Sequence, residues 1–362
     1  MPAGPNMPSF LERTRAAAKI IVIDFGFLGD SVHLVPALWE IKRHYAGAQL
    51  HVLSAKVGAE LLALAPCVDR PWAFPLTAKS PPWWKHWDIL LALRRQRFGA
   101  AFNFAGSDRS LFASAFIGAP WTLGVEVGRS HFWKGWLVSD LVERATREVP
   151  VFEQRRLALA AGGFSLQPAR FDLRVPEEAR QWARQTVPEN LTHLSINAAS
   201  TPLNEWPLQN WIELVRNLLA ADGSLHLAAT SSAQPREQAR VAALAKAVDN
   251  KRLMCLTGPS IAQLAAVLQR SHLHIGADSG VLHLAMSLGV PTLALFRDRG
   301  GLKEWMPVGP QHRQFVAKCR CLKENRTDCL AAGQASCLAS ISAGQVAEEA
   351  WSRSSRSIDF HP

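Results

Sequence analysis

Short apolar runs alternate with longer amphipathic segments along this chain. In the first part, continuous apolar runs predict buried strands at Lys19–Asp24, Gln49–Leu53 and Ala100–Phe104. Segments with apolar residues at helical spacing predict helices at Asp30–Tyr45 and Gly58–Leu64. Because strands and helices alternate, we expect a parallel sheet with helices packed on its faces.

The same alternation starts again after a polar, proline-containing stretch at residues 168–190. The strands expected there are Leu191–Asn197, Leu225–Ala229, Leu253–Leu256, Leu273–Ala277 and Thr292–Leu295. The helices expected between and after them are Pro207–Ala221, Pro235–Val248, Ser260–Arg270, Gly280–Leu288 and Ser342–Arg353. Two of these helices begin with a capping box, formed by Ser260 with Gln263 and by Ser342 with Gln345.

This repeated pattern predicts an α/β fold with two doubly wound, Rossmann-like domains. We place them at residues 1–175 and 176–341, followed by a C-terminal helix in residues 342–362 that can pack back on the first domain. Ligands are expected at the carboxyl ends of the strands, in a cleft between the domains.

Length and composition agree with two globular domains. The chain has 362 residues, of which 48% are hydrophobic and 19% charged, and this composition excludes a disordered or fibrous protein. No apolar run approaches the roughly 20 residues of a membrane-spanning helix, and the N-terminus lacks a signal-peptide pattern. We therefore expect a cytoplasmic protein.

The formal charge of +10 favours an anionic partner, such as a nucleotide, a nucleic acid or a phosphorylated lipid surface, although a generic basic surface explains it equally well. Aromatic and basic residues gather between positions 72 and 136, where they can form a membrane-contacting surface or belong to the core. These residues are Trp72, Trp83, Trp84, Trp87, Trp121, Trp133 and Trp136, with Lys79, Lys85, Arg94, Arg95, Arg97, Arg109, Arg129 and Lys134.

A glycine-containing turn connects the first strand to the first long helix. It consists of Gly26, Phe27, Leu28 and Gly29 and leads into Asp30. Such a turn lets the backbone approach a ligand, and the helix N-terminus favours negative charge. The dinucleotide-binding and Walker A patterns are absent from the sequence, which argues against hydride transfer and P-loop ATP hydrolysis. Taken alone, Asp30 can also be a helix cap.

Two further strand ends in the second domain carry polar residues. One strand ends in Asp278, Ser279 and Gly280 and continues directly into a helix, which predicts an anion site of free backbone amides and hydroxyls. Asp278 can equally cap this helix, and His283 can belong to its packed face. Small hydroxyl residues also follow the strand that ends near Asn197.

Three regions together resemble the signature regions of the ADP-heptose:lipopolysaccharide heptosyltransferases, glycosyltransferase family 9. They are Phe25–Leu38, Ala199–Trp211 and Gly276–Phe296, and their order and spacing agree over nearly the whole chain. The resemblance implies a GT-B fold with an N-terminal acceptor domain and a C-terminal donor domain. It also implies an inverting, metal-independent transfer of heptose from ADP-heptose to a lipopolysaccharide core acceptor of the lipid A-Kdo type.

The resemblance also implies roles for individual residues. Asp30 matches the general base that acts on the acceptor hydroxyl, a task that suits a carboxylate with a raised pKa. Ser200 and Thr201 match residues that bind the donor phosphates, and Glu237 matches an acid that holds the nucleotide ribose. The residues that match the motif facing the diphosphate and sugar are Asp278, Ser279, Gly280 and His283.

One position departs from the family pattern. Two residues before Trp206 the family usually has a lysine that neutralises the leaving diphosphate, and this chain has Asn204. Losing a cation there weakens transition-state stabilisation unless another takes its place. The candidates are Arg297, Arg299 and Lys303, which follow the last predicted strand.

Four cysteines lie in one C-terminal segment with the spacing C-x-C-x7-C-x7-C: Cys319, Cys321, Cys329 and Cys337. In a cytoplasmic protein they indicate a structural zinc or iron site before disulfides, with free thiols as the alternative. Some relatives that heptosylate proteins bind iron in this segment, which favours a metal site here but leaves zinc, iron and free thiols open. Cys67 and Cys255 are isolated, and we expect both to be buried.

Three alternative functions remain open at this stage. The acceptor can be a protein, such as an autotransporter, or the chain can be a degenerate relative that binds nucleotide-sugars without turnover. A nucleic-acid binder fits less well, because the basic residues are dispersed and no nucleic-acid-binding module is present. The partners expected are therefore an ADP-sugar, an anionic lipopolysaccharide core and the inner face of the inner membrane.

Overall fold

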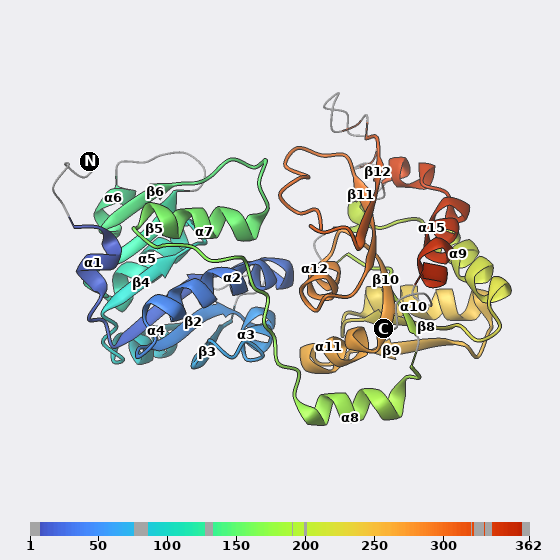
Figure 1. Ribbon diagram of the computed structural model, residues 1–362, viewed down its shortest axis with the longest axis horizontal. Coiled ribbons are helices and arrows are strands. Elements are labelled where there is room, and N and C mark those ends of the chain that lie inside the picture. The colour runs from blue at the N-terminus through green and yellow to red at the C-terminus, as the bar shows by residue number, and fades with distance from the viewer. Residues whose placement is uncertain are drawn as a thin grey trace. The chain divides into compact units, whose positions relative to one another are not determined.

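The computed structural model describes residues 8–75, 86–126, 133–189, 191–198, 201–319, 321, 329 and 335–356. The chain divides into two compact units, Met1–Arg174 and Val175–Pro362. Each unit contains one parallel, six-stranded sheet with helices packed on it (Figure 1). The α/β, doubly wound fold class predicted from the sequence is therefore confirmed.

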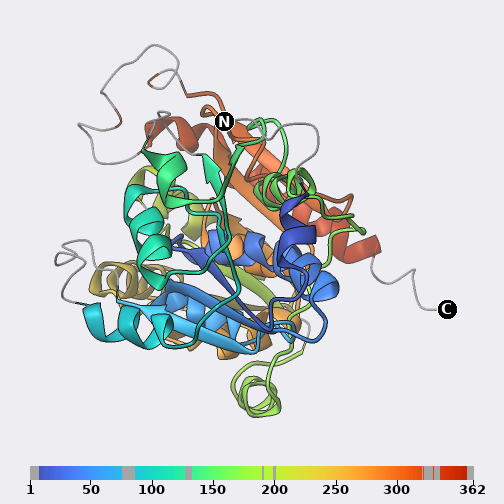
Figure 2. The same ribbon diagram turned by 90° about the vertical axis from the view of Figure 1, so that its left-hand side faces the viewer.

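The sheet of the first unit has the strand order β3-β2-β1-β4-β5-β6. Its strands are β1 (Lys19–Asp24), β2 (Gln49–Ala55), β3 (Arg70–Phe74), β4 (Ala100–Asn103), β5 (Thr122–Glu126) and β6 (Asp140–Glu143). Its helices are α1 (Phe10–Thr14), α2 (Leu28–His44), α3 (Lys56–Leu62), α4 (Trp87–Arg94), α5 (Asp108–Ile117), α6 (Lys134–Leu137) and α7 (Val151–Ala161). In Figure 2, α4 and α5 lie on one side of the strands and α1 and α7 on the other.

The second unit repeats this topology, with the order β12-β11-β10-β7-β8-β9. Its strands are β7 (Leu191–Ser195), β8 (His226–Ser231), β9 (Leu253–Thr257), β10 (Ser271–Ala277), β11 (Thr292–Arg297) and β12 (His312–Ala317). Its α-helices are α8 (Glu177–Thr186), α9 (Leu208–Ala221), α10 (Pro235–Val248), α11 (Ile261–Gln269), α12 (Gly280–Ser287) and α15 (Ala343–Arg356), and its 3-10 helices are η2 (Pro202–Asn204) and η3 (Ser336–Ser340).

The strand order reverses at the centre of each sheet, between β1 and β4 in the first unit and between β7 and β10 in the second. Doubly wound sheets bind ligands at this switch point, beyond the carboxyl ends of the strands. The turn after β1 and the loops after β7 and β10 are therefore the places where the fold favours a site.

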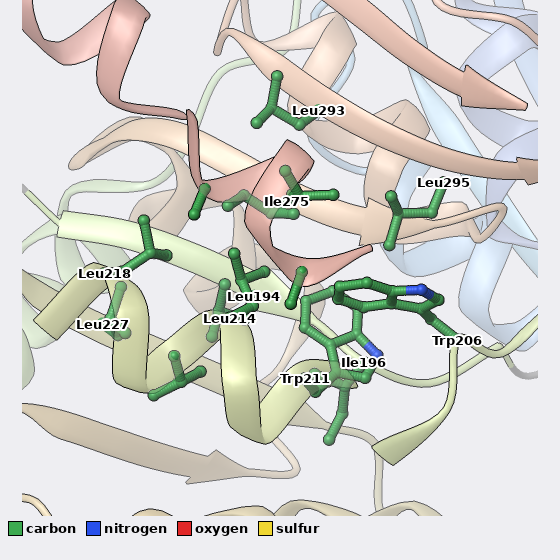
Figure 3. Close-up of a cluster of buried hydrophobic side chains, with 14 of the residues drawn as sticks. Leu194, Ile196, Trp206, Trp211, Leu214, Leu218, Leu227, Ile275, Leu293 and Leu295 are labelled. Atoms are coloured by element: carbon green, nitrogen blue, oxygen red, sulfur yellow. The ribbon is translucent and has the colours of Figure 1, made fainter. Parts of the chain in front are cut away.

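A large apolar cluster of the second unit joins the sheet to α9 and α15 (Figure 3). Trp206 and Trp211 are fully buried in it, and their rings meet edge to face at 5.1 Å between centroids. The Trp206 indole N–H donates to the carbonyl of Ile341, 3.0 Å away, just before α15. The apolar face of α15 thus packs on α9 within its own unit, and a contact with the first unit stays a prediction.

The structure confirms most of the predicted helices and strands and corrects the expected burial of one residue. Both capping boxes are formed, at Ser260 with Gln263 and at Ser342 with Gln345. The prediction that Cys255 is buried was wrong, because β9 is an edge strand and this side chain points to solvent. In the described part of the chain, no helix is both long and apolar enough to cross a bilayer.

Candidate functional site

The turn after β1 holds Asp30 tightly against Gly26. A Cβ atom added at Gly26 would lie 2.1 Å from the Cβ of Asp30, so only glycine fits there. The Oδ2 atom of Asp30 accepts a hydrogen bond from the Phe27 amide at 2.9 Å, which gives this residue a capping role as well. The Phe27 side chain itself is 70% exposed, and Gly29 is buried at the start of α2.

An ion-pair network that the sequence did not reveal surrounds this carboxylate. Arg155, on α7, donates to the Oδ2 atom of Asp24 and to the backbone carbonyl of Asp30. Its Nη2 atom lies 3.9 Å from the Asp30 Oδ1 atom. Arg155 and Asp24 are buried, whereas the Asp30 side chain keeps 27% of its surface exposed. Asp30 is therefore the member of this network that a ligand can reach.

Burial raises the pKa of Asp30, and the neighbouring negative charge of Asp24 raises it further. The guanidinium of Arg155 and the hydrogen bond from Phe27 act in the opposite direction. A carboxylate with a raised pKa accepts a proton more readily than an ordinary aspartate, which is the property that a general base needs.

In the second unit, the loop after β7 is fixed by Glu205. This buried carboxylate accepts hydrogen bonds from the Ala198 amide at 3.0 Å and from Arg236 at 2.7 Å. Thr201 caps the short helix η2, because its hydroxyl accepts a hydrogen bond from the Leu203 amide. The predicted phosphate ligand Ser200 lies outside the described residues.

The loop after β10 brings three of the predicted donor residues together. Ser279 is the N-cap of α12, Gly280 is the first residue of this helix, and the Ser279 hydroxyl lies 3.4 Å from the hydroxyl of Ser195 on β7. Asp278 is buried and forms an ion pair with Arg299 at 2.7 Å. This arrangement leaves the first amides of α12 beside the switch point, where an anion can bind.

His283 and Glu237 are both buried. Burial lowers the pKa of His283 to about 4, so its imidazole is neutral at physiological pH and faces Trp305, 5.5 Å away between ring centroids. Glu237 accepts a hydrogen bond from the Ser232 amide at 2.9 Å. Their roles toward the sugar and the ribose stay predictions.

Arg297 occupies the place next to Asn204. Its Nη2 atom lies 3.5 Å from the Oδ1 atom of Asn204, and both side chains are buried. Of the three candidate replacements for the missing lysine, Arg297 is thus the one that contacts position 204, while Arg299 is paired with Asp278. A guanidinium from β11 therefore lies beside the residue that departs from the family pattern.

Three of the four C-terminal cysteines lie together, and the fourth, Cys337, contacts Cys319. The Sγ atoms of Cys319, Cys321 and Cys329 lie within 4.8 Å of one another, with 3.3 Å between Cys321 and Cys329. Burial, together with a hydrogen bond to Cys319, raises the pKa of the Cys337 thiol to about 12. Three converging sulfur ligands, two of them buried, with Cys337 beside Cys319 as a fourth, are a donor set that fits tetrahedral zinc or iron.

Aromatic side chains gather on and beside helices α4, α5 and α6 of the first unit, and three of the five described below are exposed. Phe112 is 51% exposed and stacks on Trp133, with 5.7 Å between ring centroids. One helical turn further along α5, Phe116 meets the ring of Trp87 at 4.7 Å. Trp136, on α6, is 80% exposed. We call these five residues the aromatic surface.

The other aromatic and basic residues of this region have different environments. Trp72 and Trp121 are half-buried, with the guanidinium groups of Arg70 and Arg13 over their rings. Lys134 is buried. Trp83, Trp84, Lys79, Lys85 and Arg129 lie outside the described residues.

Comparisons with known proteins agree with the family that the three sequence regions indicate. Residues 86–334 match the sequence model of glycosyltransferase family 9 (heptosyltransferase). Lipopolysaccharide heptosyltransferase 1 of Pseudomonas aeruginosa is 26% identical over 293 residues, which cover 77% of this chain and 78% of that protein. The fold is similar to that of E. coli ADP-heptose lipopolysaccharide heptosyltransferase II, with a TM-score of 0.74, 18% identity and coverage of 92% of this chain and 98% of that one. The E. coli heptosyltransferase WaaC with ADP gives a TM-score of 0.71 at 16% identity, with coverage of 92% and 99%.

Proposed function

This chain belongs to glycosyltransferase family 9, the heptosyltransferases, and from this premise we propose that it transfers heptose from ADP-heptose to a lipopolysaccharide core acceptor. The matched region covers residues 86–334. The Pseudomonas relative is named for lipopolysaccharide, and the E. coli neighbours are named for ADP-heptose and ADP, which supports this donor and this acceptor class.

The observation that carries the proposal is the environment of Asp30. Its carboxylate lies in the turn after β1, keeps part of its surface exposed and has a raised pKa. In the proposed reaction it takes the proton of the acceptor hydroxyl while that oxygen attacks the anomeric carbon of heptose and the bond to the ADP phosphate breaks. A single displacement of this kind inverts the anomeric configuration and leaves ADP as the second product.

The second unit supplies the proposed donor site. The N-terminus of α12, with Ser279 and Gly280, binds the diphosphate through backbone amides. Arg297, beside Asn204, replaces the cation that the family usually has at position 204 and stabilises the charge that develops on the leaving diphosphate. Thr201 and Glu237 are proposed to contact the phosphates and the ribose.

The aromatic surface is proposed to rest on the anionic inner face of the membrane, where a lipid-linked acceptor is available. Exposed tryptophan rings suit the headgroup region, and Arg94 and Arg109 are exposed on the same helices. Trp136→Ser and Phe112→Ser should each weaken sedimentation with vesicles containing anionic lipid. The matched control is Val308→Ser, an exposed apolar residue of the second unit. Unchanged vesicle binding by both Trp136→Ser and Phe112→Ser would contradict this membrane contact.

The cysteine cluster is proposed to bind a structural zinc or iron, and no metal takes part in the transfer itself. The residues that would hold it are Cys319, Cys321, Cys329 and Cys337. Elemental analysis of anaerobically purified protein tests this point, and a metal content near zero would contradict it.

A transfer screen tests the proposed activity. The donors are ADP-heptose, ADP-glucose, UDP-sugars and GDP-mannose, each offered with lipid A-Kdo acceptors and, separately, with a protein acceptor. We expect turnover with ADP-heptose and the lipid acceptor. A preference for another donor would refute the heptose assignment, modified serine residues would indicate a protein acceptor, and binding without turnover would indicate a non-catalytic relative.

A further inference from the structure

Arg297 is a buried cation whose charge is poorly compensated. Its side chain is 9% exposed, and its contact with Asn204 is long, at 3.5 Å. Among the described residues, its Nε atom has no hydrogen-bond partner and no carboxylate lies within ion-pair distance. Removing an unpaired guanidinium from water is unfavourable, so this position favours an anion nearby.

Two places close to Arg297 acquire negative charge once a ligand is bound there. One is the proposed diphosphate site, because Asn204 belongs to the loop after β7. The other is the cysteine cluster: Arg297 pairs in register with Ala317, and Cys319 follows only two residues later. The short helix η3, which carries Cys337, packs against β11 and β12. Arg297 therefore lies between the cluster and the loop that contains Asn204.

Arg299, another candidate replacement for the missing lysine, differs from Arg297 because it has a charged partner. Arg299 is neutralised by Asp278 at 2.7 Å. Arg297 is thus the arginine for which the described residues supply no carboxylate partner.

We propose that metal bound by the four cysteines holds Arg297 beside Asn204, so that metal loading sets the affinity of the second unit for the donor's diphosphate. Four neutral thiols carry no charge, whereas four thiolates around a divalent ion carry a net charge of two minus, which compensates a guanidinium. An arginine has five N–H donors in a fixed fork, so Nε can face the thiolates while the Nη atoms face Asn204 and a phosphate. The inference rests on the proposed ADP-sugar donor, and the cluster acts as a positioning device outside the chemistry.

The test measures ADP binding by calorimetry, without any transfer assay. Wild-type protein purified anaerobically is loaded with Zn²⁺ or Fe²⁺, and a second sample is stripped with a chelator; circular dichroism checks that both are folded. We expect stripping to weaken ADP binding roughly tenfold, within the usual range of coupling between two sites. By reciprocity, ADP should tighten metal binding by the same factor.

Two variants separate positioning from general stabilisation. Cys337→Ser should weaken ADP binding as stripping does, and Arg297→Gln should bind ADP weakly whether or not metal is present. Cys255→Ser, on the exposed edge strand, is the matched control and should behave as wild type. An equal effect of metal in wild type and Arg297→Gln, tighter ADP binding after stripping, or no metal bound at all would each overturn the inference. Failure of the metal-loaded wild type to bind ADP would instead refute the proposed donor, and the inference with it.

Discussion

Burial and Asp24 raise the proton affinity of Asp30, Arg155 lowers it, and removing the charge of Arg155 gives a prediction whose size can be worked out. At 3.9 Å from the Asp30 Oδ1 atom, a unit positive charge contributes about 4 kcal/mol at an effective dielectric constant near 20 and about 1 kcal/mol in water. These energies correspond to about 3 and about 0.8 in pKa. Because Asp30 is 27% exposed and Arg155 also serves Asp24, we expect Arg155→Gln to raise the pKa of Asp30 by about 1 to 2.

The sign of the kinetic effect follows from the role of the base. A general base acts in its deprotonated form, so a higher pKa moves the acid limb of the kcat/KM profile to higher pH, by about 1 to 2 pH units. Arg155→Lys keeps the charge and should move the limb less. ADP affinity should stay unchanged in both variants, because the proposed donor residues belong to the second unit.

Stability and activity have to be separated in this experiment. Arg155→Gln also leaves the buried Asp24 without its partner, which lowers the melting temperature, so profiles are recorded below the onset of unfolding. An acid limb at the wild-type position in folded Arg155→Gln protein would refute the electrostatic coupling between Arg155 and Asp30.

Three further predictions concern other parts of the molecule. Gly26→Ala should lower the transfer rate at least about tenfold while ADP affinity is retained, because the new Cβ would displace Asp30. The control Gly47→Ala should be neutral, because a Cβ at Gly47 meets no atom within 4 Å. Equal activities of the two variants in a steady-state assay would contradict this prediction. Asn204→Lys should reduce kcat, because the new ammonium lies beside Arg297, and a higher kcat would show that Arg297 leaves room for a second cation. The free energy of unfolding should fall as pH drops from about 6.5 toward 4. Burial lowers the pKa of His193 to about 3, so the unfolded state binds the proton at a higher pH than the folded state does. His193→Gln should therefore reduce the slope of the unfolding free energy against pH by up to about 1.4 kcal/mol per pH unit.

The centres of both sheets could be predicted because their strands are continuous apolar runs. Residues Ile20 to Ile23 of β1 are fully buried, and the pattern shows this directly. The edge strands of the first sheet gave no comparable signal: β3 contains a proline and buries only one residue, and β6 has acidic residues at both ends. Helix α8 was not predicted, because it lies in a polar stretch and buries only two alanines.

The positions of the candidate site residues in the fold were easiest to predict where these residues follow a strand. Asp278 comes directly after β10, and Asp30 lies in the first turn of α2, the helix that follows β1, so topology places both near a switch point. Arg155 lies 125 residues from Asp30 on an ordinary helix, and no spacing rule connects the two. The contact between Arg297 and Asn204 likewise depends on the packing of a loop, although the missing lysine pointed to a replacement.

Asp30→Asn tests the central claim most directly, because it removes the proposed base while keeping the size of the side chain. Transfer from ADP-heptose is measured beside ADP-heptose binding, with Asp108→Asn, an exposed acidic residue at the start of α5, as the matched control. We expect Asp30→Asn to bind the donor as wild type does and to transfer heptose roughly a hundredfold more slowly or worse, with the control unaffected. Near-normal turnover by folded Asp30→Asn protein would show that Asp30 is only a helix cap and that the proton is taken elsewhere.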